Sequence, residues 1–460
     1  MPISTSPPKI TVEDSAARFS GLGLRSAVVA ALGGFLFGFD TAVISGAEKA
    51  LQRLFALDPF WLGLTVAAAL IGTIVGSVVI EKPADSIGRK KTLFLLAILY
   101  FASSVGSAVA TSWAVLVSAR FVGGIAIGGA SVVAPMYIAE ISPSRLRGRL
   151  VAINQLNVVV GILLSFISNY VISLYFPSEI AWRWMLGVVA VPSAAFFVLL
   201  FSIVESPRWL VKVGRTEEAG SVLARLGHAD VSGELGAIQT SLSGPVTRDR
   251  LFQRRYARPL FLAWAIAMFN QLSGINALMY YAPRIFEMTG VGEGSALSQS
   301  IAIGGVNLAF TLLGMALIDF VGRRNLIIWG SFGYIASLGT VAWAFQHYGG
   351  TFDRTGGVIV LVGLLAFQAS HAFSQGAVIW VFIAEIFPNA VRAKGQAFGS
   401  FTHWFMAAAV SWTFPIIAAR SGAWAFGFFA AMMGLQLLFA WKVMPETKGG
   451  SLEDVEIRLG

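Results

Sequence analysis

The 460-residue sequence contains no cysteine and few charged residues. The absence of cysteine excludes a disulfide framework, a thiolate nucleophile and a cysteine-ligated zinc site. Asp, Glu, Lys and Arg make up 12% of the chain and hydrophobic residues 56%, whereas soluble domains carry about 25% charged residues. This balance excludes an ordinary soluble enzyme, and it also excludes a disordered chain, which needs the opposite composition.

What the sequence has instead is long hydrophobic runs. A membrane-spanning helix needs roughly 20 mostly apolar residues to cross a ~30 Å hydrocarbon core. Twelve such runs occur, six before a polar stretch at 205–258 and six after it. The first run does not end in an A-x-A-like cleavage site, so we interpret it as a retained helix rather than a signal peptide. The predicted spans are 25–47, 60–80, 92–110, 113–139, 151–175, 183–204, 259–286, 297–318, 326–346, 357–384, 396–417 and 423–444.

Most of the 33 Lys and Arg residues lie in alternate connections between these runs. Cytoplasmic loops of membrane proteins carry such an excess. The distribution therefore predicts that both termini are cytoplasmic. It also accounts for the net charge of +9 without a nucleic-acid partner. The basic segments lie at 9–25, 82–91, 145–149, 208–258, 323–324, 392–394 and 442–458.

Two short motifs occur twice. The segment DSIGRKKTL at 85–93 returns as DFVGRRNL at 319–326, 234 residues later, and IAEISP at 138–143 returns as IAEIFP at 383–388, 245 residues later. Two independent motifs at nearly equal offset indicate duplicated halves of six helices each. Such halves rock around a site near the bilayer midplane and give alternating access.

Each repeated motif lies at the inner end of a helix. A carboxylate there can pair with an arginine and with a helix terminus, which predicts a salt-bridge latch. The alternative is that the basic clusters only set orientation, since ion pairs at an aqueous interface contribute little. The predicted latch residues are Asp85, Arg89, Glu140, Arg147, Asp319, Arg323, Glu385 and Arg392.

Two charged residues lie alone inside predicted spans. Asp40 is the only charged residue within 26–47, and Arg120 the only one within 92–139. A lone charge at a helix centre costs about 2.5–3.5 kcal/mol on insertion scales. At 1.5 Å per residue both lie roughly 20 Å from the inner face, so we predict that they form an ion pair.

Separation of this pair would let Asp40 take up a proton, and renewed pairing would expel it. That is a proton-symport switch. The alternative is a static pair that locks two helices together.

The seventh run carries a cluster of polar side chains. A monosaccharide has hydroxyls that donate and accept and apolar C–H faces, so it requires amides and aromatic rings rather than charges. Gln271 lies on another helix face unless the helix unwinds, and Gly274 is well placed for that. The alternative is hydrogen bonding between helices. Four side chains fit within about 120° of one face: Asn270, Ser273, Asn276 and Tyr280.

With these residues identified, the chain resembles the sugar porter family of the major facilitator superfamily. Each matching motif is weak alone, but ten in the family's order are specific. They are GFDTAVISG at 38–46, D-x-x-GRK at 85–90, RFVGG at 120–124, PMYIAE at 135–140, ESPRW at 205–209, QLSGIN at 271–276, YY at 280–281, D-x-x-GRR at 319–324, EIFP at 385–388 and PETKG at 445–449.

The resemblance implies an all-α membrane protein of 12 transmembrane helices in two pseudo-symmetric six-helix bundles, the major facilitator fold. It divides the chain into an N-terminal bundle, a linker of short cytoplasmic helices, a C-terminal bundle and a cytoplasmic tail. These are residues 1–204, 205–258, 259–444 and 445–460. Within the linker, helix-like stretches lie at 216–226 and 233–242.

The resemblance also implies a substrate site and adds Glu205 to the latch. Asp40 resembles the bacterial and plant proton-coupled members, whereas animal facilitative carriers usually have asparagine there. Tyr280 and Tyr281 would gate the site from outside. The implied substrate residues are Phe37, Gln155, Asn270, Gln271, Asn276, Tyr280, Asn307, Gly376, Trp380, His403 and Trp404.

The sequence departs from the family pattern at several positions. Asn270 replaces the first of two glutamines, and no proline follows Gly376, so we expect a weaker break in the tenth helix. His371 and His403 replace residues that are usually aromatic or amide. Both histidines could contact substrate or bond between helices, and their titration near neutral pH makes them rivals of Asp40 as proton carriers.

We therefore predict a secondary transporter that takes up a hexose or pentose with a proton. It would be a monomer, multi-pass in the plasma or bacterial inner membrane, and not an enzyme. No Walker A loop or metal-ligand cluster occurs in the sequence, so no cofactor or metal is expected. The alternatives are a proton-independent facilitator, a sugar sensor that does not transport, and a polyol carrier, which would share every motif.

Overall fold

A computed structural model describes most of the chain. Its described residues form helices and loops and contain no strand. The predicted cytoplasmic positions of both termini fall on 1–19 and 449–460 and lie outside the described residues. The described ranges are 20–143, 146–243, 250–349, 351–388 and 390–448.

The first half of the chain forms six spans. Several begin with a side-chain cap: Ser20, Asp58 and Ser112 each accept a hydrogen bond from a backbone N–H of the first helical turn. The elements are α1 (Gly21–Leu54), α2 (Pro59–Val79) continued by α3 (Glu81–Ser86), α4 (Arg89–Ala108), α5 (Trp113–Ile141), α6 (Arg147–Tyr175), and α7 (Ser178–Gly187) followed by α8 (Ala190–Leu199) and the 3-10 helix η1 (Leu200–Ser202).

The second half repeats this arrangement. With the first half it gives twelve spans long and apolar enough to cross a membrane among the described residues, as the sequence predicts. The elements are the 3-10 helix η2 (Arg254–Tyr256) with α12 (Ala257–Leu272) and α13 (Ile275–Glu287), α14 (Glu293–Val321), α15 (Arg323–Tyr348), α16 (Arg354–Phe373) with α17 (Gln375–Glu385), α18 (Arg392–Ala418) and α19 (Gly422–Lys442).

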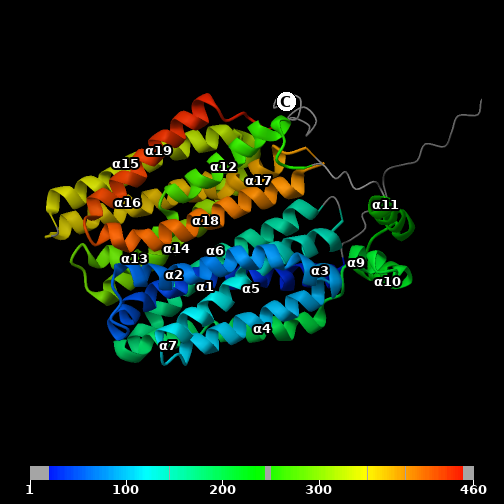
Figure 1. The fold of residues 1–460 in the computed structure, drawn as a ribbon, viewed down its shortest axis with the longest axis horizontal. Helices are drawn as coiled ribbons and strands as arrows, with labels where there is room; N and C mark the ends of the chain where they lie inside the picture. The colour runs from blue at the N-terminus through cyan, green and yellow to red at the C-terminus, as the bar shows by residue number, and fades with distance from the viewer. Residues whose placement is uncertain (1–19, 144–145, 244–249, 350, 389, 449–460) are drawn as a thin grey trace, which may run out of the picture.

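The two halves lie side by side as two layers of roughly parallel helices, the first half below and the second half, from the green α12 to the red α19, above in Figure 1. Within the first half α1 packs on α6 and α2 on α5, and within the second half α15 packs on α19. The halves meet where α2 contacts α18, α6 contacts α14 and α1 contacts α13. Large apolar side chains such as Val78 and Phe320 are exposed on the outside, which is expected where lipid is the solvent.

Three short helices follow the first bundle and lie beyond one end of both bundles (Figure 1). They are α9 (Pro207–Lys212), α10 (Thr216–Leu226) and α11 (Val231–Ser243). The sequence predicts α10 with its bounds and α11 to within two residues, and it misses α9. We name this side of the molecule the linker end and the opposite side the far end.

The seventh span is interrupted between α12 and α13. Gly274 separates the two helices with φ of +85°, in the left-handed region that favours glycine. Beyond it, Tyr281 departs from helical geometry, just before Pro283, whose ring removes a backbone hydrogen bond. The unwinding that the sequence allows at Gly274 is therefore present.

The tenth span corrects an expectation. Instead of a weak break near Gly376, the chain is fully interrupted at Ser374, with φ −108° and ψ −92°, between α16 and α17. The Ser374 hydroxyl donates to the Ser370 carbonyl at 2.5 Å, so a side chain takes the place of backbone bonding there. A proline is not needed for this break.

Candidate functional site

A cavity of about 150 Å³ lies between the two bundles and is lined by both. Helices α1 and α6 line it from the first half, and α12, α13, α14, α16, α17 and α18 from the second. All eleven predicted substrate residues line it: Phe37, Gln155, Asn270, Gln271, Asn276, Tyr280, Asn307, Gly376, Trp380, His403 and Trp404. The sequence analysis did not assign Thr41, Thr311 or Gln368, which also line it.

Amide side chains on either side of the Gly274 break are connected to one another. Asn276 donates to Gln271 at 2.8 Å, and Gln271 donates to Asn270 at 2.9 Å. The Gln271 amide nitrogen also lies 3.2 Å from the ring of His403. Because the helix unwinds between them, amides from different faces of a regular helix meet at one wall of the cavity.

This network continues away from the cavity. Asn270 donates to Gln375 at 3.4 Å, Gln375 donates to Gln436 at 2.7 Å, and Gln436 donates to Ser331 at 2.9 Å. A chain of satisfied buried amides fixes the orientation of its first members. The cavity amides of the seventh span are thereby held by the ninth, tenth and twelfth spans.

Aromatic rings form another wall. Phe37 meets Trp404 edge to face at 5.5 Å between ring centroids, across the two bundles. Trp380 lies 4.9 Å from the His403 ring. Such rings offer an apolar surface to sugar C–H groups.

The structure also places the tyrosine pair, Ser273 and the two histidines. Of the tyrosine pair, Tyr280 lines the cavity, whereas Tyr281 is fully buried and donates to the Ser411 carbonyl at 3.0 Å. Ser273 faces its own helix and donates to the Asn270 carbonyl at 2.6 Å. Both histidines line the cavity and contact a neighbouring helix: His371 contacts the Tyr334 hydroxyl at 2.7 Å, and a ring nitrogen of His403 lies 3.2 Å from the Gln271 amide nitrogen. Contact with substrate stays a prediction for both.

Asp40 and Arg120 form the predicted ion pair. Arg120 Nη1 donates to Asp40 Oδ1 at 2.7 Å. Both residues are buried, with Arg120 2% exposed and Asp40 5% exposed. Asp40 Oδ2 and Arg120 Nε and Nη2 have no hydrogen-bond partner among the described residues. The neighbouring residue Thr41 lines the cavity, so the pair lies directly behind the cavity wall.

The linker end of the first bundle carries a cluster around Arg89. This guanidinium donates to both oxygens of Glu140 at 2.9 Å and to Asp85 at 3.1 Å. Glu205 accepts from the backbone N–H groups of Arg89 and Lys90 at the start of α4. The helix dipole favours a carboxylate there, yet burial dominates and raises the pKa of Glu205 above its ordinary value.

The second bundle repeats this cluster around Arg323. Arg323 donates to Glu385 at 2.8 Å and to Asp319 at 3.1 Å. Glu446 accepts from the backbone N–H groups of Arg323 and Arg324 at the start of α15. Glu446 therefore takes the position that Glu205 has in the first bundle.

The sequence analysis did not identify Glu446 as a latch residue. Hydroxyls complete the likeness of the two clusters: Ser206 donates to Glu140 at 2.5 Å, and Thr447 donates to Glu385 at 2.6 Å. The signal was present, because the dipeptide Glu-Ser at 205–206 returns as Glu-Thr at 446–447, close to the offset of the other repeats.

Two predicted latch residues make other contacts. Arg147 donates to the Ala139 carbonyl at 3.1 Å, and Arg392 donates to the Phe387 carbonyl at 3.2 Å. Each side chain thus bonds to the backbone near the end of the preceding helix. The carboxylates expected for them are already occupied by Arg89 and Arg323.

Ion pairs at the far end join the two bundles, and the sequence analysis missed them. Glu48 on α1, 1% exposed, accepts two hydrogen bonds from Arg284 on α13, at 2.8 Å from Nε and 2.6 Å from Nη2. One residue along, Lys49 pairs with Glu287 at 2.6 Å. In the sequence, opposite charges are adjacent at 48–49 and lie three residues apart at 284 and 287. Which of them pair is determined only by the tertiary fold.

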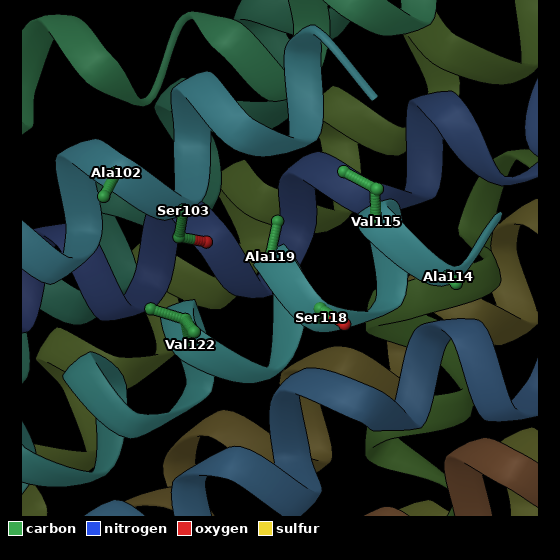
Figure 2. A pocket seen from close by; sticks show the side chains of 7 residues that line it. All are labelled: Ala102, Ser103, Ala114, Val115, Ser118, Ala119 and Val122. Atoms are coloured by element: carbon green, nitrogen blue, oxygen red, sulfur yellow. The ribbon is translucent and has the colours of Figure 1, made fainter. Parts of the chain in front are cut away.

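A separate hollow of about 450 Å³ lies between α4 and α5 (Figure 2). Its lining consists of small or apolar side chains, whereas the central cavity is lined largely by amides and aromatic rings. The lining residues are Ala102, Ser103, Ala114, Val115, Ser118, Ala119 and Val122. Among the described residues, no group of three His, Cys, Asp or Glu side chains is placed to hold a metal ion.

Known proteins resemble this chain over nearly its whole length. The glucose transport protein of Synechocystis sp. is 36% identical over 449 residues, 93% of this chain and 95% of that protein. The D-xylose-proton symporter of Escherichia coli K12 is 35% identical over 468 residues, 93% of this chain and 94% of that protein. The inward-open xylose transporter XylE of E. coli matches with a TM-score of 0.84 at 33% identity, covering 94% of this chain and 98% of that one.

The family described as sugar (and other) transporter matches residues 26–459. This match, the twelve spans and the likeness to XylE agree on a multi-pass membrane transporter with the major facilitator fold rather than an enzyme. The chain belongs to the sugar transporter family.

Proposed function

We propose that this protein takes up a monosaccharide together with a proton across the cell membrane by alternating access. The linker end, which carries most Lys and Arg, faces the cytoplasm, and both termini lie on that side. The observation that carries the proposal is the buried ion pair of Asp40 and Arg120 directly behind the cavity wall. A relative named as a proton symporter supports the same assignment.

The central cavity binds the sugar. Its amides on α12 and α13 offer donors and acceptors to hydroxyls, and Phe37, Trp380 and Trp404 offer apolar faces. Both bundles contribute, since Gln155 comes from α6 and the remaining amides from the second half. Bound sugar therefore links the bundles and favours states in which they close around it.

Asp40 carries the proton. In the ion pair the carboxylate is ionised and Arg120 neutralises it. When a bundle rearrangement separates the two, the buried carboxyl takes up a proton, because a lone charge in this environment is costly. Arg120 stays charged throughout, so re-pairing releases the proton on the other side.

The remaining ion pairs have two different tasks. The clusters around Arg89 and Arg323 keep each bundle rigid at the cytoplasmic end, and the Glu48–Arg284 and Lys49–Glu287 pairs hold the outer end closed. One chain supplies both bundles and the whole cavity lining, so the transport unit is a monomer.

The test is sugar uptake into proteoliposomes or cells by the Asp40→Asn variant. We expect it to lose proton-driven accumulation while keeping exchange and downhill flux, because asparagine cannot carry the proton. Asp58→Asn is the matched control, since Asp58 only caps α2 and asparagine caps equally well. If Asp40→Asn still concentrates sugar in response to a proton gradient, the coupling assignment is wrong.

The second candidate is a proton-independent facilitator. It is favoured if the ion pair stays formed throughout the cycle, so that Asp40 and Arg120 only join α1 to α5. The two functions differ in one measurement: addition of sugar to cells alkalinises an unbuffered medium for a symporter and leaves its pH unchanged for a facilitator.

A further inference from the structure

Gln368 on α16 differs from the other buried amides around the cavity. Its side chain is fully buried and lines the cavity, yet neither Oε1 nor Nε2 has a hydrogen-bond partner among the described residues. Asn270, Gln271 and Asn276, by contrast, are all hydrogen-bonded to neighbouring side chains. An amide left without partners in a buried position costs free energy.

The position of Gln368 explains what can satisfy it. It precedes His371 and Ala372 by three and four residues on one helix, so the three share a face, and all three line the cavity. Asn307 and Thr311 on α14 line the same cavity, and α14 packs against α16. These side chains form a polar corner in the second bundle.

An amide offers one acceptor and a donor group, which suits a hydroxyl that both donates and accepts. Because the amide is neutral, it does not favour an ion over a hydroxyl as its partner. We propose that Gln368 hydrogen-bonds a hydroxyl of the bound monosaccharide and thereby determines which sugars the transporter accepts. This inference rests on the proposed sugar-transport function.

Two consequences have opposite signs. Replacing Gln368 by leucine, similar in size, removes the unpaired amide from the sugar-free protein and should raise its melting temperature. The same change should weaken binding of a sugar that carries the contacted hydroxyl by about tenfold, in the range of one hydrogen bond. If the amide had a purely structural role, Gln368→Leu would lower the melting temperature and leave the sugar preference unchanged.

The experiment is equilibrium binding to the full-length protein with D-glucose, D-xylose and the 2-, 3-, 4- and 6-deoxy derivatives of glucose. Wild type should bind several deoxy derivatives more weakly than glucose, because several amides contact hydroxyls. Gln368→Leu should abolish a preference of about tenfold for glucose over one of these derivatives while keeping the other ratios. Gln368→Asn, which keeps the amide, provides a second variant. Asn169→Leu is the control, because Asn169 is a fully buried amide that donates to the Val43 carbonyl at 3.1 Å and does not line the cavity.

The outcomes are distinct. If both Gln368 variants bind every sugar with wild-type ratios, a water molecule satisfies the amide and the inference is overturned. If Asn169→Leu changes the same ratio as Gln368→Leu, the effect is indirect and the inference is likewise overturned. If wild type binds none of these sugars, the proposed function fails instead.

Discussion

The two ends of the molecule use ion pairs in different ways. At the linker end the pairs of Arg89 and Arg323 join helices within one bundle, and each is repeated in the other bundle. At the far end Glu48 and Lys49 of α1 pair with Arg284 and Glu287 of α13, which connects one bundle to the other. The linker-end clusters are symmetric, whereas the far-end pairs have the two charges in opposite order on the two helices.

This difference indicates different tasks. A contact within a bundle is kept when bundles move as rigid bodies, but a contact between bundles must break. We therefore expect the linker-end clusters to preserve bundle shape through the transport cycle and the far-end pairs to stabilise one state of it. Three predictions test this division, and a fourth tests the electrostatics of a linker-end carboxylate.

The largest effect is expected for Arg284→Ala. It leaves Glu48 buried without its partner, which costs about 3–5 kcal/mol and is relieved when the far end opens to water. A single cysteine, Val159→Cys in the cavity wall, can report this opening because the chain has no cysteine of its own. Labelling of whole cells by a membrane-impermeant thiol reagent should be at least tenfold faster in the variant.

The matched control for this variant removes both charges at once. Glu48→Gln with Arg284→Gln leaves no unpaired charge, so its labelling rate should lie between those of wild type and Arg284→Ala. Equal labelling rates in all three proteins would mean that the pair does not hold the far end closed.

A smaller effect of a different kind is expected for Arg89→Ala. It removes hydrogen bonds to Glu140 and Asp85 within one bundle and should cost about 1.5–3 kcal/mol. The melting temperature should fall by several degrees, while labelling of the Val159→Cys reporter stays at the wild-type rate. Arg323→Ala should behave alike. Faster labelling in either variant would contradict the division between the two ends.

Lys49→Ala should have a weaker effect than Arg284→Ala. The Lys49 side chain is 34% exposed, and exposed ion pairs contribute at most about 1 kcal/mol. Reporter labelling should therefore rise by no more than about fivefold. The contribution of the Lys49–Glu287 pair to far-end closure in wild type should also decrease in high salt. A titration of the labelling rate against sodium chloride would measure this decrease.

The smallest effect concerns Glu205. Because its pKa is raised by burial, the folded protein binds this proton more tightly than the unfolded chain. The group thus contributes most stability below its ordinary pKa, and that contribution is lost as pH rises through the raised value. The melting temperature of wild type minus that of Glu205→Gln should decrease by about a degree or two between pH 4 and pH 7. An increase would contradict the sign.

The sequence is sufficient to predict the architecture because its signals are local. Each span is a continuous apolar run, and the Gly88–Arg89 and Gly322–Arg323 repeats mark equivalent corners of the two bundles. Both glycines have φ above +90°, and a side chain there would meet Glu205 or Glu446. Such positions require glycine, which is why the repeat can be recognised in the sequence.

Other features depend on packing that no local pattern encodes. Glu48 and Arg284 resemble ordinary charges at helix ends until α1 and α13 are placed side by side. Arg147 and Arg392 follow the repeated glutamates, but Arg89 and Arg323 reach those carboxylates from neighbouring helices. Gln368 lies within an apolar run, and only the folded structure shows that its amide has no hydrogen-bond partner among the described residues.

The break at Gly274 has a mechanical consequence. Helix α13 has Asn276 in the cavity at one end and Arg284 and Glu287, roughly 12–17 Å away at 1.5 Å per residue, in the far-end pairs at the other. It can bend at two points, the Gly274 break at its base and the kink at Tyr281 between the two groups. We therefore expect a sugar that binds Asn276 to move the first part of α13, and the kink to determine how much of that movement reaches the charged residues at the far end.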